Sequence, residues 1–177
     1  MEKDNTEPKL EPRLSLLWWM LEDVRKVTLK GIEGLSKEQF FQPPIEGEYP
    51  VGAYVMHLAE AEVFWLQILT GTKVDKEIKK RIYYDSWMNP SKSDAESPKA
   101  PPEINEYLEA IKEVRELLKK YMSSLKDSDL YGFVVQQRKA GEHKILKKWI
   151  IYHLIEHEAH HRGQMMLLIR KAAFKKS

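Results

Sequence analysis

Four long stretches of this sequence repeat apolar residues with the period of an amphipathic helix, and this pattern is the strongest constraint on its fold. Gly, Pro, Ser and charged residues dominate the segments between them. Pro50 and Gly71 flank the second stretch, in agreement with the preference for proline at the start of a helix and glycine just after its end. We therefore predict helices over Leu14 to about Gly31, Val51 to Thr70, about Glu103 to Leu125, and about Leu146 to Ala173.

The connections between these helices are long, at residues 32–50, 71–102 and 126–145. The third includes "VVQQRKAGEHKI", where a short hairpin or an irregular turn around Gly141 would fit. The rest of the chain has no internal repeat, and it lacks the alternation of short apolar strands with helices that predicts a parallel sheet. The pattern predicts an all-α fold, a four-helix bundle whose long connections permit crossover wiring.

The length of 177 residues suits one domain, which we place at residues 13–177 after a loose polar tail at 1–12. The tail has no apolar centre of the kind found in secretory signals, and no run of about 18 apolar residues offers a membrane span. We expect no membrane partner.

The chain has no cysteine, so any metal would rest on imidazole or carboxylate groups, and the reducing cytoplasm is the expected location. The net charge is +2, and its local basic excess, "RKAAFKKS", is what the dipole favours at a helix C-terminus. We therefore expect no nucleic acid partner.

Four of the six histidines lie in "HLIEHEAHHRGQ", residues 153–164. On a helix, His157 and His161 are one turn apart and about 40° offset around the axis, so both rings can reach one ion. His153 with His157 and His157 with His160 are also workable pairs, whereas His160 and His161 point about 100° apart. His157 belongs to every workable pair.

Two zinc-peptidase patterns overlap in this stretch: "HEAHH" reads H-E-x-x-H and "HLIEH" reads H-x-x-E-H. Those enzymes take a third ligand from downstream sequence. The residues after His161, "RGQMMLLIRKAAFKKS", contain no His, Asp or Glu. A third protein ligand must therefore come from upstream.

Two histidines remain as upstream candidates. His143 lies in the polar connector "KAGEHKI", where we expect it at the surface. His57 lies in the second predicted helix on a mostly apolar face. A single buried histidine is more often a hydrogen-bonded core residue than a ligand, but its combination with a histidine pair on the last helix favours a metal site. The residues that share the face of His57 are Ala53, Tyr54, Ala61, Phe64 and Ile68.

These motifs resemble those of the DinB/YfiT-like proteins. The final helix of that family carries H-x-x-x-H-R-G-Q, matched here from His157 and His161 to Gln164, and "HLAEAEVFWL" around His57 is similar to its second helix. The resemblance spans nearly the whole chain. It implies a four-helix bundle whose metal is held by one histidine of the second helix and two of the last, which agrees with His57, His157 and His161.

Three neutral imidazoles on one side of a divalent ion leave positions for water or substrate, as catalytic sites do. Zn²⁺, Ni²⁺ and Fe²⁺ all accept imidazole, and spacing does not choose among them.

The residues near His157 and His161 on the last predicted helix are expected to have different roles. We expect His153 and His160 to flank the site, and Glu158 to pair with Arg162 on the outside of the helix rather than to act as a base. Gln164 could bond a ligand or join a helix interface. Gly163 suggests close approach by another helix or by substrate. We expect Trp18, Trp19, Trp65 and Trp149 in the core.

The resemblance implies an enzyme, because the superfamily includes transferases that use bacillithiol or mycothiol. Such an enzyme would activate a low-molecular-weight thiol for transfer to a small electrophile, and the thiol would be a cosubstrate because the chain has no cysteine. A metal-dependent hydrolase is one alternative. A non-enzymatic stress-response or binding protein with a structural metal is another. Homodimers are common among the proteins it resembles, although periodicity alone does not show one here.

Overall fold

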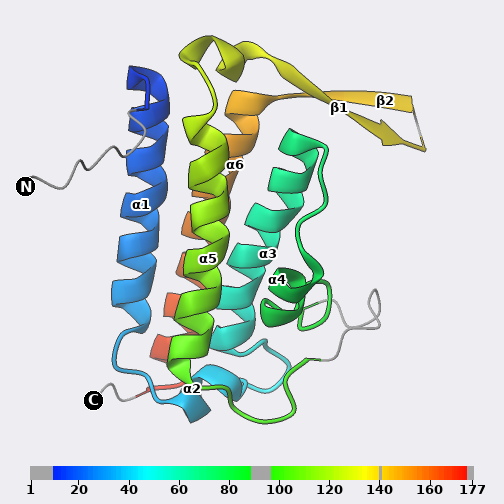
Figure 1. Ribbon diagram of the computed structural model, residues 1–177. Helices are drawn as coiled ribbons and strands as arrows, with labels where there is room; N and C mark the ends of the chain where they lie inside the picture. Colours follow the sequence, from blue (N-terminus) through cyan, green and yellow to red (C-terminus); the bar gives the residue numbers. More distant parts are fainter. Residues whose placement is uncertain (1–9, 89–96, 140, 175–177) are drawn as a thin grey trace, which may run out of the picture.

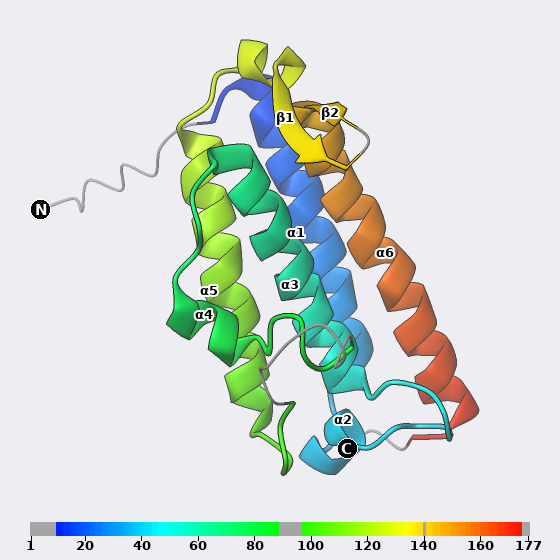
Figure 2. The ribbon, with the colours of Figure 1, turned by 90° about the vertical axis from the view of Figure 1, so that its right-hand side faces the viewer.

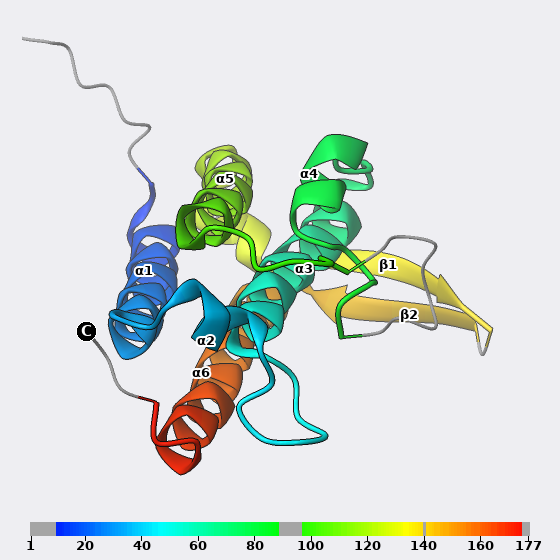
Figure 3. The same ribbon diagram turned by 90° about the horizontal axis from the view of Figure 1, so that it is seen from below.

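Four long helices run along the molecule in the computed structural model, which describes residues 10–88, 97–139 and 141–174 (Figure 1). Seen from below, they surround a shared interior (Figure 3). The predicted four-helix architecture is confirmed. Residues 1–9 of the expected tail lie outside the described residues, and Pro12 already belongs to the first helix. The long helices are α1 (Pro12–Ile32), α3 (Val51–Thr70), α5 (Ile104–Ser123) and α6 (Lys147–Lys171).

The connections carry shorter elements that periodicity did not predict, because one or two helical turns are too short to show a period. Ser36 and Gln39 form a reciprocal capping box that starts α2, and the Asp75 side chain caps α4. Of the two alternatives expected around Gly141, the hairpin is present: β1 pairs antiparallel with β2, and Gly141 adopts a φ of 109° where β2 begins. These elements are α2 (Lys37–Phe41), α4 (Lys76–Arg81), a 3₁₀ helix (Asp127–Tyr131), β1 (Phe133–Arg138) and β2 (Gly141–Leu146).

Helix α3 is the central helix of the bundle. Most of its 20 residues are buried, and it packs against both α5 and α6, while α1 packs against α6. Gly52 permits the close approach of α5, because a Cβ atom there would lie 2.8 Å from the Tyr107 ring. Among the polar side chains of α3, Glu62 is buried, and His57 and Glu60 are half-buried.

The tryptophan prediction holds only in part. Trp65 on α3 is buried, and Trp18 on α1 is half-buried. Trp19 is 60% exposed and Trp149 is 43% exposed, so the core prediction is wrong for both. Each lies beside the buried stripe of its helix, since α1 and α6 bury one face where α3 buries nearly all of its surface.

Over the residues described, none of the helices combines the length and apolar character that crossing a membrane requires.

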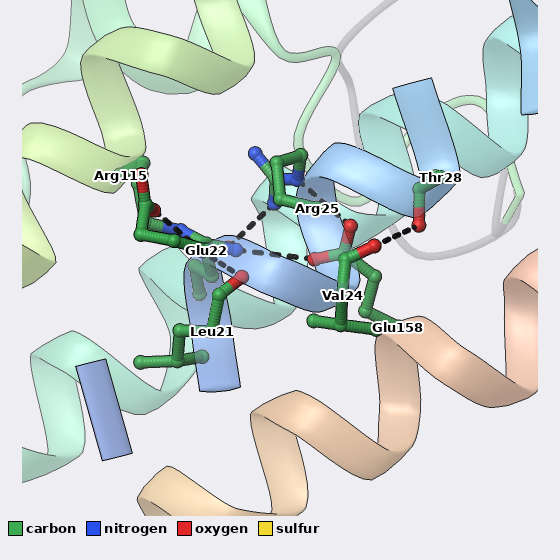
Figure 4. Close-up of polar contacts among 8 residues, drawn as sticks. Leu21, Glu22, Val24, Arg25, Thr28, Arg115 and Glu158 are labelled. Atoms are coloured by element: carbon green, nitrogen blue, oxygen red, sulfur yellow. Dashed lines mark hydrogen bonds and ion pairs between the residues drawn. The ribbon is translucent and has the colours of Figure 1, made fainter. Parts of the chain in front are cut away.

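Each long helix places one charged side chain in the interior. Together these side chains form a neutral cluster of two arginines and two glutamates. Figure 4 labels Arg25, Arg115 and Glu158. Arg25 of α1 donates to Glu62 of α3 over 2.7 Å and to Glu158 of α6 over 2.9 Å. Arg115 of α5 reaches the same two carboxylates over 2.6 Å and 3.1 Å. Arg115 also donates to the Leu21 carbonyl over 2.6 Å. We call Arg25, Glu62, Arg115 and Glu158 the charge cluster.

The arginines and glutamates of the cluster stabilise one another in their charged forms. Burial alone would raise the pKa of Glu62, but the charges of Arg115 and Arg25 and their hydrogen bonds outweigh it and hold this pKa below its ordinary 4.5. Burial opposes the charge of Arg115 as well, and the neighbouring glutamates outweigh that effect and raise the pKa of Arg115. Both groups are therefore charged at neutral pH.

Glu158 contradicts the sequence prediction. It does not pair with Arg162 on the outside of α6: it is 2% exposed and lies in the charge cluster. The reason is that α1 and α5 each bring an arginine into the interior, and these partners are more than 40 residues away in the sequence. Because successive helical residues are about 100° apart, fixing Glu158 inward also fixes the direction in which His157 leaves α6.

Breaking the charge cluster should cost much more stability than breaking a surface ion pair. Glu158→Ala leaves two buried arginines facing one buried carboxylate, Glu62, and we expect the free energy of unfolding to fall by about 3–5 kcal/mol in urea titrations. The matched control is Glu113→Ala, which removes the partner of Arg81 at the exposed surface of α5. That change should cost less than about 1 kcal/mol. Equal losses in the two variants would contradict the role assigned to the cluster.

Candidate metal centre

Three histidine rings meet at the border between α3 and α6. His57 comes from α3, and His157 and His161 come from successive turns of α6. The ring centroids are 5.1 Å apart for His57 and His157, 4.9 Å for His57 and His161, and 4.4 Å for His157 and His161. One nitrogen of each ring lies within 4.8 Å of the others, and no carboxylate of the described residues joins this group. We call His57, His157 and His161 the histidine triad.

The helices position the histidine triad. The colours in Figure 2 show that α3 and α6 run in opposite directions, which brings the first half of α3 beside the second half of α6. The i, i+4 spacing puts His157 and His161 on one side of α6, and their Nε2 atoms lie 3.2 Å apart. The triad is therefore built on two rigid elements that pack directly against each other.

Two of the rings are held from behind by residues three positions later on the same helix. His57 Nδ1 lies 2.8 Å from Glu60 Oε2, and His161 Nδ1 lies 2.6 Å from Gln164 Oε1. An oxygen acceptor at Nδ1 keeps the proton on that nitrogen and leaves the Nε2 lone pair available, as in many metal-binding histidines. Gln164 thus contacts a triad ring, a role that the sequence had left open.

Glu60 is the residue that sequence reasoning missed. Its other carboxylate oxygen accepts a hydrogen bond of 2.6 Å from the Asp85 backbone N–H, so Glu60 links His57 to the turn after α4. Asp85 adopts a positive φ of 58° in that turn. The i, i+3 spacing of His57 and Glu60 in "HLAE" was a usable signal. The contact with Asp85 was not, because it joins residues 25 positions apart.

Burial and neighbouring rings keep the two α6 histidines of the triad uncharged. Burial is the main cause that lowers the pKa of His157 to about 3, with further contributions from the rings of His161 and His57. Burial and His57 likewise lower the pKa of His161 to about 4, although its bond with Gln164 acts in the opposite direction. Both rings are neutral at pH 7. Neutral imidazole nitrogens are the donors that Zn²⁺, Ni²⁺ and Fe²⁺ accept, so these residues fit a divalent ion.

The other expected neighbours lie outside the triad. The His153 ring is stacked on Trp149 and lies 5.7 Å from the His157 ring, while exposed His160 contacts His161 with ring centroids 5.1 Å apart. His143 is exposed on β2, as expected.

Gly163 does not serve helix packing. It is exposed, and a Cβ atom there would meet no described atom within 4 Å apart from its chain neighbours and the nearby backbone of α6. The prediction of close approach by another helix is therefore wrong, because this residue lies on the outer side of α6.

Comparison with known structures finds the same fold in several proteins of low sequence identity. A conserved protein from Enterococcus faecalis has a TM-score of 0.67 at 12% identity, with 90% of this chain and 96% of that chain covered. A DinB-like protein from Bacillus cereus has a TM-score of 0.61 at 19% identity, with 93% of each chain covered. YfiT from Bacillus subtilis, described as a probable metal-dependent hydrolase with an unusual four-helix bundle topology, has a TM-score of 0.62 at 16% identity and covers 98% of this chain and 95% of its own.

A sequence search of curated proteins gives no match. The family model of the DinB superfamily matches residues 20–165, a range that includes all three triad histidines and nearly all of the bundle. Because this match covers most of the sequence and the solved neighbours share the bundle over nearly its full length, the chain belongs to the DinB superfamily.

Proposed function

We propose that this protein is a divalent-metal-dependent enzyme whose ion is held by the Nε2 atoms of His57, His157 and His161. The observation that carries the proposal is the geometry of the triad: three ligand nitrogens lie within 4.8 Å of one another, and Glu60 and Gln164 orient two of the rings. A divalent ion with three protein ligands acts as a Lewis acid and lowers the pKa of a water or thiol that binds to it.

The surroundings of the triad argue against peptidase-like chemistry. In the H-E-x-x-H peptidases the glutamate acts as a general base. Here the corresponding Glu158 is bound by Arg25 and Arg115 in the interior, on a different side of α6 from His157. Glu60, the carboxylate in contact with the triad, already holds His57 and the Asp85 backbone. A nucleophile that needs no protein base suits this site best.

A low-molecular-weight thiol is such a nucleophile, and we propose its transfer to a small electrophile as the reaction. The chain has no cysteine, so the sulfur arrives with a cosubstrate. The thiol releases its proton to solvent, the thiolate sulfur forms a bond to the electrophilic carbon, and the leaving group departs with the electron pair of the broken bond. The residues of the chain bind and orient the reactants, and Glu60 and Gln164 hold their imidazoles in place.

Hydrolysis of a small molecule is the second candidate. It is supported by the fold shared with YfiT, which is described as a probable metal-dependent hydrolase. The two reactions differ in their need for a thiol, which makes them separable in one experiment.

We expect thiol-dependent loss of a generic electrophile in the presence of metal-loaded protein. Monochlorobimane would be followed by fluorescence with bacillithiol, mycothiol or glutathione, and a panel of esters, amides and lactones would be tested without thiol. His57→Ala should abolish turnover, and His143→Ala, a change on exposed β2, should leave it intact. Turnover without thiol would replace S-transfer by hydrolysis. No turnover in either assay would support a non-enzymatic protein with a structural metal.

The lowered pKa values predict that metal binding depends weakly on pH. His157 and His161 are neutral well below pH 6, so neither has a proton to release when the ion binds between pH 6 and pH 5. Between pH 6 and pH 5 the affinity for Zn²⁺ should therefore fall by no more than about tenfold, as measured by competition with a chelator. Three histidines with ordinary pKa values would give a loss on the order of 500-fold, and that result would contradict the electrostatic account.

Removing the group behind His57 should weaken the metal site without dismantling the bundle. We expect Glu60→Ala to lower the affinity for Zn²⁺ by about 10- to 100-fold, because the His57 ring loses the acceptor that orients it. Glu156→Ala is the matched control, since Glu156 is an exposed glutamate of α6 whose carboxylate lies 3.5 Å from His153 Nδ1. Unchanged affinity in Glu60→Ala, with an unchanged circular dichroism spectrum, would remove Glu60 from the site.

A further inference from the structure

Four aromatic side chains continue the row of rings beyond the histidine triad. We call Phe64 and Trp65 of α3 together with Trp149 and His153 of α6 the aromatic strip. The Trp149 and His153 rings are stacked, with centroids 4.8 Å apart and planes 6° apart. Trp65 meets both edge-on with centroids 5.6 Å away, and Phe64 meets Trp65 over 5.2 Å. The strip is one connected set of rings across the α3–α6 border.

The aromatic strip is continuous with the triad. On α6, Trp149, His153, His157 and His161 follow one another at i, i+4, and the rings of His153 and His157 are 5.7 Å apart. On α3, Phe64 lies two turns after His57, a distance of about 10 Å along the helix axis. The strip therefore runs from the triad toward the end of the bundle where the hairpin lies (Figure 2).

Parts of the strip face solvent although they are apolar. Phe64 is 41% exposed and Trp149 is 43% exposed, whereas Trp65 behind them is buried. Large exposed aromatic side chains that adjoin a polar site are typical of ligand-binding surfaces, because a bound molecule removes their apolar area from water. Aromatic faces and edges also favour flat partners, which stack on them or meet them edge-on.

We infer that the aromatic strip binds a planar aromatic or conjugated group of the substrate, while the reacting group of that substrate lies at the histidine triad. This inference rests on the proposed function for the position of the reacting group. The separation along α3 sets the size of the ligand: its planar group lies about 10 Å from the group that reacts. The substrate class is thus a molecule with a flat, apolar group at one end and a reactive group at the other.

The test is direct binding of 2-naphthol, a flat bicyclic probe, compared with decahydro-2-naphthol, which has the same carbon skeleton without aromatic rings. Binding to the full chain would be followed by ligand-observed NMR. Wild-type protein should prefer 2-naphthol, and both Phe64→Leu and Trp149→Leu should weaken its binding by about 5- to 10-fold. Leucine keeps both positions apolar, so the loss reports on the flat ring.

Two control variants keep the result specific. Trp19→Leu changes another exposed tryptophan, on α1. Tyr152→Leu tests a cavity of about 460 Å³ between α1 and α6 that Trp149 also lines. Neither change should alter the affinity for 2-naphthol. No binding by the wild type, no preference for the flat probe, or unchanged affinity in Phe64→Leu and Trp149→Leu would overturn the inference, and so would a loss in Tyr152→Leu as large as in Trp149→Leu.

The outcome is separable from that of the proposed function. The strip does not require the ion, so His57→Ala should bind 2-naphthol like the wild type while losing metal. If 2-naphthol binds as expected but the wild type binds no metal, the proposed function fails and the strip stands. If metal binding and turnover are present but Trp149→Leu keeps full affinity for 2-naphthol, the strip fails and the proposed function stands.

Discussion

The buried pairing of two arginines with two glutamates is the interaction on which the rest of this structure depends. Each of the four long helices contributes one member, so the cluster fixes the rotation of every helix relative to the others. Apolar packing alone tolerates many small rotations, whereas a buried charge without its partner is costly. The charge cluster therefore selects one arrangement of the bundle.

The geometry of the histidine triad follows from that arrangement. With Glu158 held in the interior, His157 leaves α6 toward α3, and the next turn brings His161 beside it. His57 completes the triad from the central helix, where Glu60 holds its ring. One short stretch of α6 thus serves two purposes: a charged residue secures the interior, and its histidine neighbours form the candidate site at the border between helices.

The sequence predicted the elements whose signals are local. Periodicity found the four long helices to within a few residues, and the i, i+4 pair with one inward-facing upstream histidine predicted the residues that the fold brings together as the triad. It did not predict the place of Glu158 or the link from Glu60 to Asp85, because their partners lie on other elements far along the chain. The core prediction for Trp149 was wrong because hydrophobicity indicates burial only on average, and single apolar side chains are often exposed.

Metal content measured on protein purified without an affinity tag is the most direct test of the central claim, that the bundle assembles a three-histidine metal site. Elemental analysis after exposure to Zn²⁺, Ni²⁺ or Fe²⁺ and gel filtration would compare the wild type with His57→Ala and His143→Ala. The account predicts about one ion per chain in the wild type and in His143→Ala, and almost none in His57→Ala, because two imidazoles hold a divalent ion far less tightly than three. No bound metal in the wild type, or equal metal in all three proteins, would contradict it.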